Sequence, residues 1–151
     1  MSVEGGQTGW TGKYNSHSVV TRVQPAGGSY DGLWALQVTP ASGTSGAAGI
    51  SNANPIWVTN TAAGQVYEGS VFVNPSVAGE KVSLVVKETT SGGTSVASHV
   101  TTITAASGWQ QITSTYTAKN SGDYIRYVVY ASNFASSSQN FLADCLSLWS
   151  P

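Results

Sequence analysis

The stretch FLADCLSLW at residues 141–149 places an acid among apolar residues near the end of the chain. Alternate residues of a strand point to one face, so Leu142, Asp144, Leu146 and Leu148 are predicted to lie together. Three of the four are typical core residues, and an unpaired carboxylate among them would be costly to bury. The sequence therefore predicts that Asp144 has a partner inside the fold.

The chain has the size of one globular domain and carries few charges. Its 151 residues are close to the commonest domain size, so we expect a single domain over 1–151. Charged residues make up 9% of the chain, against roughly a quarter in typical soluble proteins. The formal net charge is −1, which argues against a nucleic acid or an anionic membrane as partner. No apolar run approaches the roughly 18 residues of a membrane-spanning helix.

The first residues and the cysteine content bear on the setting of the domain. The opening MSVEGG has neither the basic start nor the apolar stretch of a signal peptide. Either a secretion signal has been removed or the domain was cut from a larger multidomain protein. Cys145 is the only cysteine, so no intrachain disulfide is possible. We expect an unreactive, partly buried thiol and a monomeric domain.

Runs rich in β-branched and aromatic residues recur along the chain, and each is closed by Gly, Ser, Asn or Pro. No segment shows sustained helical periodicity. The candidate strands are 18–23, 33–38, 56–60, 65–73, 81–88, 95–104, 109–117, 123–131 and 141–149. About nine strands with turns between them predict an all-β fold, an antiparallel β-sandwich of the jelly-roll kind.

Several strands have an outer face that mixes aromatic and hydrogen-bonding side chains. In 123–131, alternation assigns Tyr127 to the core and leaves Tyr124, Arg126 and Tyr130 on the opposite face. Such a mixture suits a sugar ring, which offers an apolar CH face and a rim of hydroxyls. The alternative is a face covered by loops or by a neighbouring domain, and the residues leave both interpretations open.

Five motifs occur in the order found in one family of sugar-binding domains. They are SVEGGQTGW (2–10), YDGLWALQVT (30–39), AGQVYEGSVFV (63–73), SGWQQITSTYTA (107–118) and FLADCLSLW (141–149). This ordered set, which spans nearly the whole chain, resembles the carbohydrate-binding modules of the family 4/9/22 type. These are jelly rolls appended to secreted bacterial polysaccharide-degrading enzymes. Two residues depart from the family pattern, because Val3 replaces a Phe and Cys145 stands where a second Asp is common.

The resemblance implies a structural calcium ion that ties the first strand to the last. The acids of the opening and closing motifs are Glu4 and Asp144, and the segment around Asp31 would add backbone oxygens and its own carboxylate. Calcium binds about 6–8 oxygen ligands and accepts carbonyls beside carboxylates, so it would offset the cost of burying Asp144. The alternatives are that Asp144 caps backbone amides or pairs with Arg22.

Most of the aromatic residues have structural explanations. Trp34 shares its strand parity with core residues, and Trp10 and Trp109 match structural positions of the family. An aromatic ring against a sugar contributes about 0.5–1.5 kcal/mol beyond area burial in comparable contacts. The candidate sugar-binding residues are Trp57, Phe72, Lys87, Gln111, Tyr124, Arg126 and Tyr130.

Catalysis needs converging groups with tuned pKa values, and no catalytic motif is present. The two histidines, His17 and His99, are far apart in sequence. We therefore expect a secreted, non-catalytic module that binds a polysaccharide or oligosaccharide and tethers an attached enzyme or surface protein. A jelly-roll polysaccharide lyase that uses His99, Arg126 and Tyr130 is a less favoured alternative.

Xylan and β-glucans are the usual ligands of the family, and Lys87 and Arg126 leave an acidic glycan such as alginate open. The main rival interpretation is a structural or adhesion domain, for example of a phage tail or a surface protein, that kept the fold and lost the sugar cleft.

Overall fold

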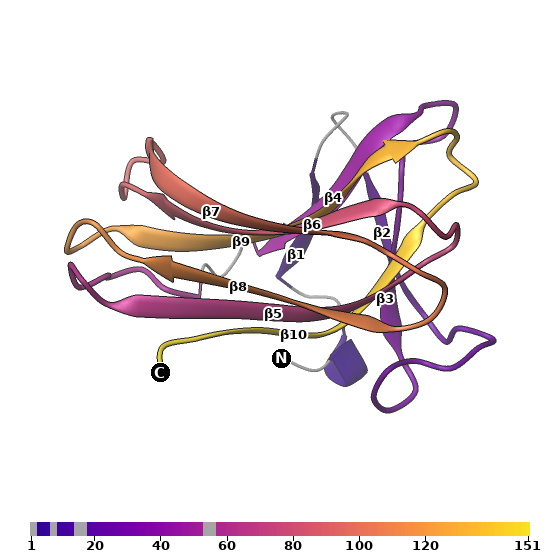
Figure 1. The fold of residues 1–151 in the computed structure, drawn as a ribbon, viewed down its shortest axis with the longest axis horizontal. Coiled ribbons are helices and arrows are strands. Elements are labelled where there is room, and N and C mark those ends of the chain that lie inside the picture. The colour runs from indigo at the N-terminus through magenta and orange to yellow at the C-terminus, as the bar shows by residue number, and fades with distance from the viewer. Residues whose placement is uncertain (1–2, 7–8, 14–17, 53–56) are drawn as a thin grey trace.

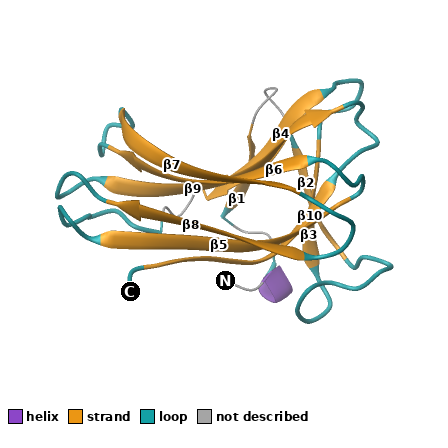
Figure 2. Cartoon of the chain, viewed as in Figure 1, coloured by secondary structure: helices purple, strands orange, loops and turns teal. Residues whose placement is uncertain are grey.

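The structure, a computed structural model, describes residues 3–6, 9–13, 18–52 and 57–151. These residues form ten strands and one short 3₁₀ helix, η1 (Val3–Gly5) (Figures 1 and 2). The strands are β1 (Trp10–Lys13), β2 (Val19–Val23), β3 (Ala35–Thr39), β4 (Gly46–Asn52), β5 (Val66–Pro75), β6 (Lys81–Thr89), β7 (Ser95–Thr104), β8 (Gln110–Thr117), β9 (Tyr124–Phe134) and β10 (Phe141–Trp149). Within this described part, the chain has no helix with the length and apolarity needed to cross a membrane.

The strands form two five-stranded sheets packed face to face. Sheet A has the order β1-β4-β9-β6-β7, and sheet B has the order β2-β3-β10-β5-β8. Every pairing between neighbouring strands is antiparallel. This arrangement confirms the predicted all-β, antiparallel sandwich.

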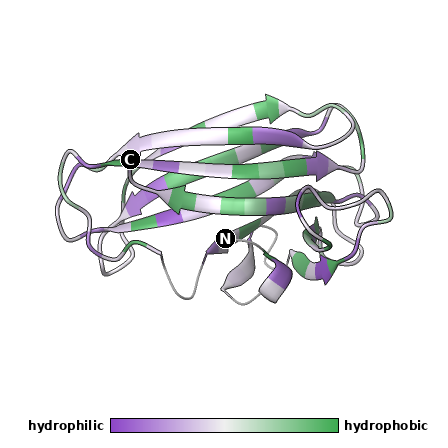
Figure 3. Ribbon diagram, turned by 90° about the horizontal axis from the view of Figure 1, so that it is seen from below, coloured by the Kyte–Doolittle hydropathy of each residue, from purple (hydrophilic) through white to green (hydrophobic). Residues whose placement is uncertain are grey.

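The core between the sheets follows the alternation of side chains along the strands. In β5 and β9 buried and partly exposed residues alternate almost without interruption, and Figure 3 shows this as bands of different hydropathy along the strands. Val71 and Val73 from β5 meet Tyr127 and Val129 from β9 in one cluster, and all four are fully buried. The face assignments predicted for residues 123–131 are therefore confirmed.

Two strands of sheet A were not predicted, and one predicted strand is absent. β1 and β4 are short of the β-branched residues that signal a strand, and β4 contains mainly Gly, Ala and Ser. Packing accounts for the glycine at position 49, because a Cβ there would lie 2.5 Å from the carbonyl oxygen of Val129. The predicted strand 56–60 is reduced to one isolated bridge at Val58, and residue 56 lies outside the described residues.

A β-bulge in β10 overturns the face assigned to Asp144. The register against β5 shifts after Asp144, where Cys145 has a positive φ of 49°. Because one extra residue is inserted, Ala143 and Leu146 both face the core, whereas Asp144 lies opposite Phe72 on the outer side of sheet B. The prediction that Asp144 shares a face with the leucines that follow it is wrong, since strict alternation fails at a bulge.

Candidate functional site

The outward face of sheet A gathers four of the predicted sugar-binding residues. Tyr124, Arg126 and Tyr130 lie on alternate positions of β9, each partly exposed, with Val128 between the last two. Lys87 on β6 is the register partner of Arg126. In Figure 1 sheet A rises at β7 on one side and at β4 on the other, so the face turned away from sheet B is concave. The two tyrosines stand about 20 Å apart along the strand, given a rise of roughly 3.3 Å per residue.

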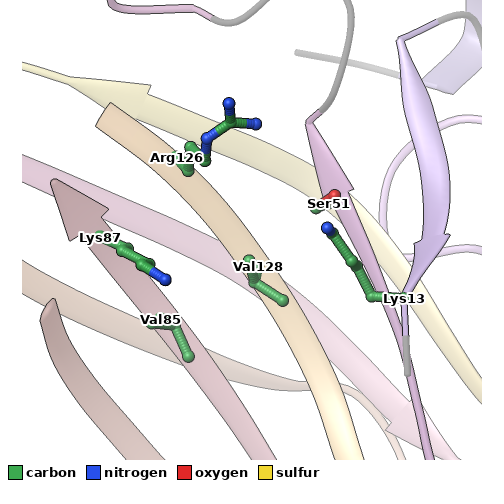
Figure 4. A pocket seen from close by; sticks show the side chains of 6 residues that line it. All are labelled: Lys13, Ser51, Val85, Lys87, Arg126 and Val128. Carbon is green, nitrogen blue, oxygen red and sulfur yellow. The ribbon is translucent and has the colours of Figure 1, made fainter. Parts of the chain in front are cut away.

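A cavity of about 220 Å³ opens on this face between the tyrosines. Side chains from β1, β4, β6 and β9 line it, and they are Lys13, Ser51, Val85, Lys87, Arg126 and Val128 (Figure 4). Figure 4 shows Val128 in the middle, with Lys87 on one side of it and Lys13 on the other. The cavity therefore has the apolar Val128 at its centre and cations around it, with Val85 beside Lys87.

The cations of the cavity have no acid beside them in the strands of sheet A. Those strands contain one acidic residue, Glu88, and its side chain is fully buried on the core side. Arg126 donates from Nε to Thr89 Oγ1 at 3.3 Å, which fixes the guanidinium on the outward face. Lysine and arginine side chains only donate hydrogen bonds, so the cavity favours a ligand rich in acceptors.

Three of the predicted sugar-binding residues lie elsewhere. Phe72 and Gln111 belong to β5 and β8 of sheet B, where they are register partners. Trp57 is partly buried and packs against the core, with its ring centroid 5.2 Å from Trp10 and 5.6 Å from Tyr127. The structure therefore does not bring these three residues to the cavity. Alternation assigns a residue to a face of its strand, but it does not say which sheet the strand joins.

Phe72 instead stacks against a loop residue on the outer side of sheet B. The rings of Tyr30 and Phe72 are 3.4 Å apart and nearly parallel, with an angle of 13°. Trp109 meets Tyr30 edge-on at 6.3 Å, and its Nε1 donates to the carbonyl oxygen of Gly28 at 3.2 Å. These contacts hold the loop before β3 on the sheet, so Trp109 has the structural role that was expected.

Sequence reasoning missed Lys13, Ser51, Val85 and Val128. Both valines share the outward parity of Lys87 and Arg126, but apolar residues carry no signal for a polar ligand. Lys13 and Ser51 lie on β1 and β4, the two strands that were not predicted. These two residues could not be assigned to the site, because the sequence did not indicate the strands that carry them.

The residues of the alternative lyase site do not converge. His99 lies opposite the core residue Val86 on β6, and its Nδ1 is 3.1 Å from Ser114 Oγ on sheet B. Arg126 and Tyr130 point to the other side of sheet A. His17 lies outside the described residues. The structure therefore does not bring His99, Arg126 and Tyr130 together in one site.

Asp144 meets backbone amides on the outer side of sheet B. Its side chain is 1% exposed, and Oδ2 accepts the amide of Asp31 at 2.9 Å while Oδ1 accepts that of Cys145 at 2.7 Å. The other proposed partner, Arg22, donates to the carbonyl oxygens of Val3 and Glu4. Amide capping, one of the alternatives left open by the sequence, thus compensates the buried charge.

Glu4 holds the same loop from the other side. Its Oε1 accepts the amides of Leu33 and Trp34 at 2.9 and 2.8 Å. Gly32 makes this approach possible, because it has a φ of +68° and a Cβ there would lie 2.6 Å from the Glu4 carboxylate.

Arg22 also lies over the Trp34 ring, 3.8 Å from its centroid. Trp34 is therefore a partly buried residue at the margin of the core.

The predicted calcium ligands are thus neighbours of one loop. Glu4 and Asp144 each contact residues 31–34, and carboxylates with backbone carbonyls are the ligands that calcium takes. Among the described residues, no three His, Cys, Asp or Glu side chains form a group that could hold a metal ion. Two carboxylates fit such an ion in chemical type, and carbonyl oxygens or water would have to supply the rest. The calcium ion stays a prediction.

Cys145 has the properties expected of an unreactive thiol. It is partly exposed and forms no disulfide. Burial, followed by the negative charges of Asp144 and Asp31, raises the pKa of the thiol above its usual range. Because the thiolate is the nucleophile, a raised pKa keeps the residue inert at neutral pH.

No protein-family model matches the chain, and no curated protein matches it in sequence. Solved structures match its fold over nearly its full length. A Family 16 carbohydrate-binding module has a TM-score of 0.65 and 18% identity, covering 98% of this chain and 95% of the module. The CBM22-1 and GH10 modules of a Clostridium thermocellum endo-1,4-β-D-xylanase, complexed with xylohexaose, have a TM-score of 0.67 and 19% identity. That match covers 95% of this chain and 26% of the xylanase chain.

A viral protein has a similar domain. The enzymatically active domain of tailspike protein 4 from bacteriophage CBA120 matches with a TM-score of 0.69 and 9% identity. The match covers 95% of this chain and 20% of the tailspike chain. The chain therefore spans about a quarter or less of the two larger proteins. At these identities the likeness shows a shared fold, the β-sandwich of carbohydrate-binding modules.

Proposed function

We propose that this domain binds polysaccharide chains on the concave outward face of sheet A and catalyses no reaction. The observation that carries the proposal is the row Tyr124, Arg126, Val128 and Tyr130 on β9, with a cavity between the two tyrosines. A tyrosine ring can stack on the apolar face of a sugar and keep a hydroxyl for hydrogen bonding. The similar modules in solved structures, one of them complexed with xylohexaose, support the same use of the fold.

The chemistry of the face supports binding without catalysis. Glycoside hydrolysis usually needs two carboxyl groups on either side of the scissile bond. The one acid in the strands of sheet A is Glu88, which points into the core and accepts hydrogen bonds from Tyr116 Oη at 2.5 Å and from the amides of Lys119 and Asn120. Glu88 therefore has a structural role and does not face a substrate bound on this surface.

The role that follows is that of a tether. A module that holds an attached enzyme or surface protein on an insoluble glycan raises its local concentration there. We propose a secreted, monomeric domain within a multidomain protein, with calcium bound between Glu4, Asp144 and the loop 31–34. The shared position of the two carboxylates on that loop supports the calcium site.

Affinity electrophoresis through gels that contain soluble polysaccharides tests the proposal. We expect retardation in at least one gel of a panel with neutral and acidic glycans, and a loss of retardation in Tyr130→Ala. Gln111→Ala is a matched control, because Gln111 is exposed on the opposite sheet. Absence of retardation in every gel would overturn the proposal.

The second candidate function is a structural or adhesion domain, and the similar domain of the phage tailspike favours it. Such a domain would use the fold without binding a sugar at the cavity. It predicts no retardation in the gels and no effect of Tyr130→Ala. The same experiment therefore separates the two functions.

A further inference from the structure

The positive charges of the chain are concentrated at the cavity of sheet A. The chain has six lysine and arginine residues, and three of them, Lys13, Lys87 and Arg126, line this cavity. The formal net charge is −1, so the concentration is local and does not reflect a basic protein. The acids Glu4, Glu68 and Asp144 lie on sheet B or its loops, away from this face.

Two of these cations occupy positions that destabilise the sheet. Lys87 and Arg126 are direct register partners on the adjacent antiparallel strands β6 and β9. Like charges directly opposite each other on paired strands are destabilising. Departures from such local rules are expected at functional sites, and this like-charge pair calls for compensation. An anion between Lys87 and Arg126 would provide it.

Three of the hydrogen-bonding side chains that line the cavity are donors only. Lys13, Lys87 and Arg126 can only donate, and Ser51 is the one lining side chain that can also accept. Neutral sugars present hydroxyls, which donate as well as accept, whereas carboxylates and sulfates only accept. Arg126 uses its Nε for Thr89, which leaves its two terminal nitrogens for charge-assisted bonds to such a group.

The size of the cavity fits part of a polymer. Its volume of about 220 Å³ lies below the roughly 300–1,000 Å³ of pockets that enclose a whole small ligand. Val85 and Val128 give the cavity an apolar part of its lining, and Tyr124 and Tyr130 lie on the same face beyond it. One acidic sugar of a chain can enter the cavity while its neighbours stack on the tyrosines.

We propose that this cleft selects polysaccharides whose sugars carry negative charges, uronic-acid carboxylates or sulfate esters, over neutral glycans. This inference rests on the proposed polysaccharide binding at the same face. A nucleic acid is also a polyanion, but its recognition relies on an extended basic field, and this chain has a net negative charge.

The test compares alginate and polygalacturonate, which carry carboxylates, with carrageenan, which carries sulfates, and with the neutral xylan, β-glucan and galactan. Binding is measured by affinity electrophoresis and calorimetry at about 20 mM and about 500 mM salt, because screening separates charge pairing from stacking. We expect at least one acidic glycan to bind at least tenfold more tightly than every neutral one, and high salt to abolish most of this preference. The carboxylate and sulfate arms show which group is recognised.

Single substitutions test whether the cations of the cavity cause the preference for acidic glycans. Lys87→Gln and Arg126→Gln are each expected to reduce the preference for acidic glycans at least tenfold, with circular dichroism to confirm folding. Lys81→Gln is the matched control, because Lys81 is exposed at the start of the same strand and does not line this cavity. We expect no change in that variant.

Three outcomes would overturn the inference. Tighter binding of neutral glycans, with no effect of salt, would leave polysaccharide binding intact and remove charge selection. Binding of single-stranded DNA as tight as that of the acidic glycans would replace selection with general polyanion binding. No binding to any glycan would overturn the proposed function itself and this inference with it.

Discussion

Lys87 and Arg126 stand directly opposite each other on neighbouring strands, and both point out of sheet A. The core residues beside them, Val86 and Tyr127, are fully buried and fix the register of the two strands. The two side chains are thus held at paired positions of the same face by packing on the other side of the sheet. Like charges at such directly paired positions generally destabilise a sheet.

Lys87→Glu is therefore expected to stabilise the free protein. It replaces a like-charge pair with an opposite-charge pair, and cross-strand pairs of that kind contribute roughly 0.2–1 kcal/mol. Thermal unfolding should show a higher melting temperature at low salt and a smaller gain at about 1 M salt. Lys81→Glu provides the control, since Lys81 pairs with Thr104 rather than with a cation. A melting temperature of Lys87→Glu below that of the unaltered protein would contradict the idea of a strained cation pair.

Glu88 is expected to be a main source of stability in the core. It is fully buried and accepts hydrogen bonds from Tyr116 and from the amides of Lys119 and Asn120. Glu88→Gln would leave at least one of these donors without its charged partner, at a cost of about 1–3 kcal/mol. Denaturant unfolding at pH 7 measures the loss, and Glu68→Gln, on the outer face of sheet B, is the control.

The same residue predicts how stability depends on pH. Burial alone would raise the pKa of the Glu88 carboxyl, but the hydrogen bonds from Lys119, Tyr116 and Asn120 outweigh it and lower the pKa below its ordinary value of 4.5. A lowered pKa means that the stabilisation is complete above pH 4.5 and is lost as the pH falls towards the folded-state value. The stability difference between the unaltered protein and Glu88→Gln should thus shrink in acid. A difference that stays constant would show that the charge of Glu88 does not matter.

Sequence reasoning succeeded where side-chain alternation and burial coincide. Tyr127 and Arg126 were each assigned to the correct face of their strand, because β9 alternates regularly. It failed at β10, because the bulge there depends on a left-handed conformation of Cys145. Cysteine is not a residue type that indicates such a conformation. It also failed at β4, where close packing against β9 excludes a side chain at Gly49 and few of the usual strand residues occur.

The site was recovered in part for a related reason. Alternation places Phe72 and Arg126 on the outward sides of their strands, and both assignments hold. The two strands belong to different sheets, however, and this depends on strand order, which long-range pairing decides. A cavity that draws Lys13 from β1 and Lys87 from β6 is for the same reason invisible in the sequence.

If calcium binds between Glu4 and Asp144, excess chelator should lower the melting temperature by several degrees. A ligand that binds only the native state stabilises it by mass action, so adding calcium back should restore the original value. Asp144→Ala should melt at a lower temperature and lose its response to the chelator. A melting curve that does not respond to chelator or calcium would indicate that the amides of the loop 31–34 suffice to hold the two carboxylates.

The backbone conformation of Cys145 predicts how substitutions there change the free energy of unfolding. Its φ of 49° lies in the left-handed region, which costs a residue with a Cβ roughly 1–2 kcal/mol and which asparagine tolerates better than most residues. Cys145→Asn should therefore preserve or raise the free energy of unfolding, and Cys145→Val should lower it because β-branched residues fit this region worst. Equal stability of the two variants, measured by denaturant unfolding under reducing conditions, would show that the bulge relaxes without strain.

Alanine variants of three aromatic residues should distinguish effects on glycan binding from effects on stability. They are Tyr130, Tyr127 and Trp57. Tyr130→Ala should weaken glycan binding at least tenfold, equivalent to about 1.4 kcal/mol, with little loss of stability, because Tyr130 points outward from β9. Tyr127→Ala should cost about 3–5 kcal/mol of stability, as for other large aromatic core truncations, since Tyr127 is fully buried and its hydroxyl donates to the carbonyl oxygen of Ser70 at 2.5 Å. Trp57→Ala should also lower stability, because the ring packs against Trp10 and Tyr127 rather than beside the cavity. Calorimetry with a bound glycan and thermal unfolding of each variant measure the two effects, and a Trp57→Ala protein that melts normally but fails to bind would return Trp57 to the sugar site.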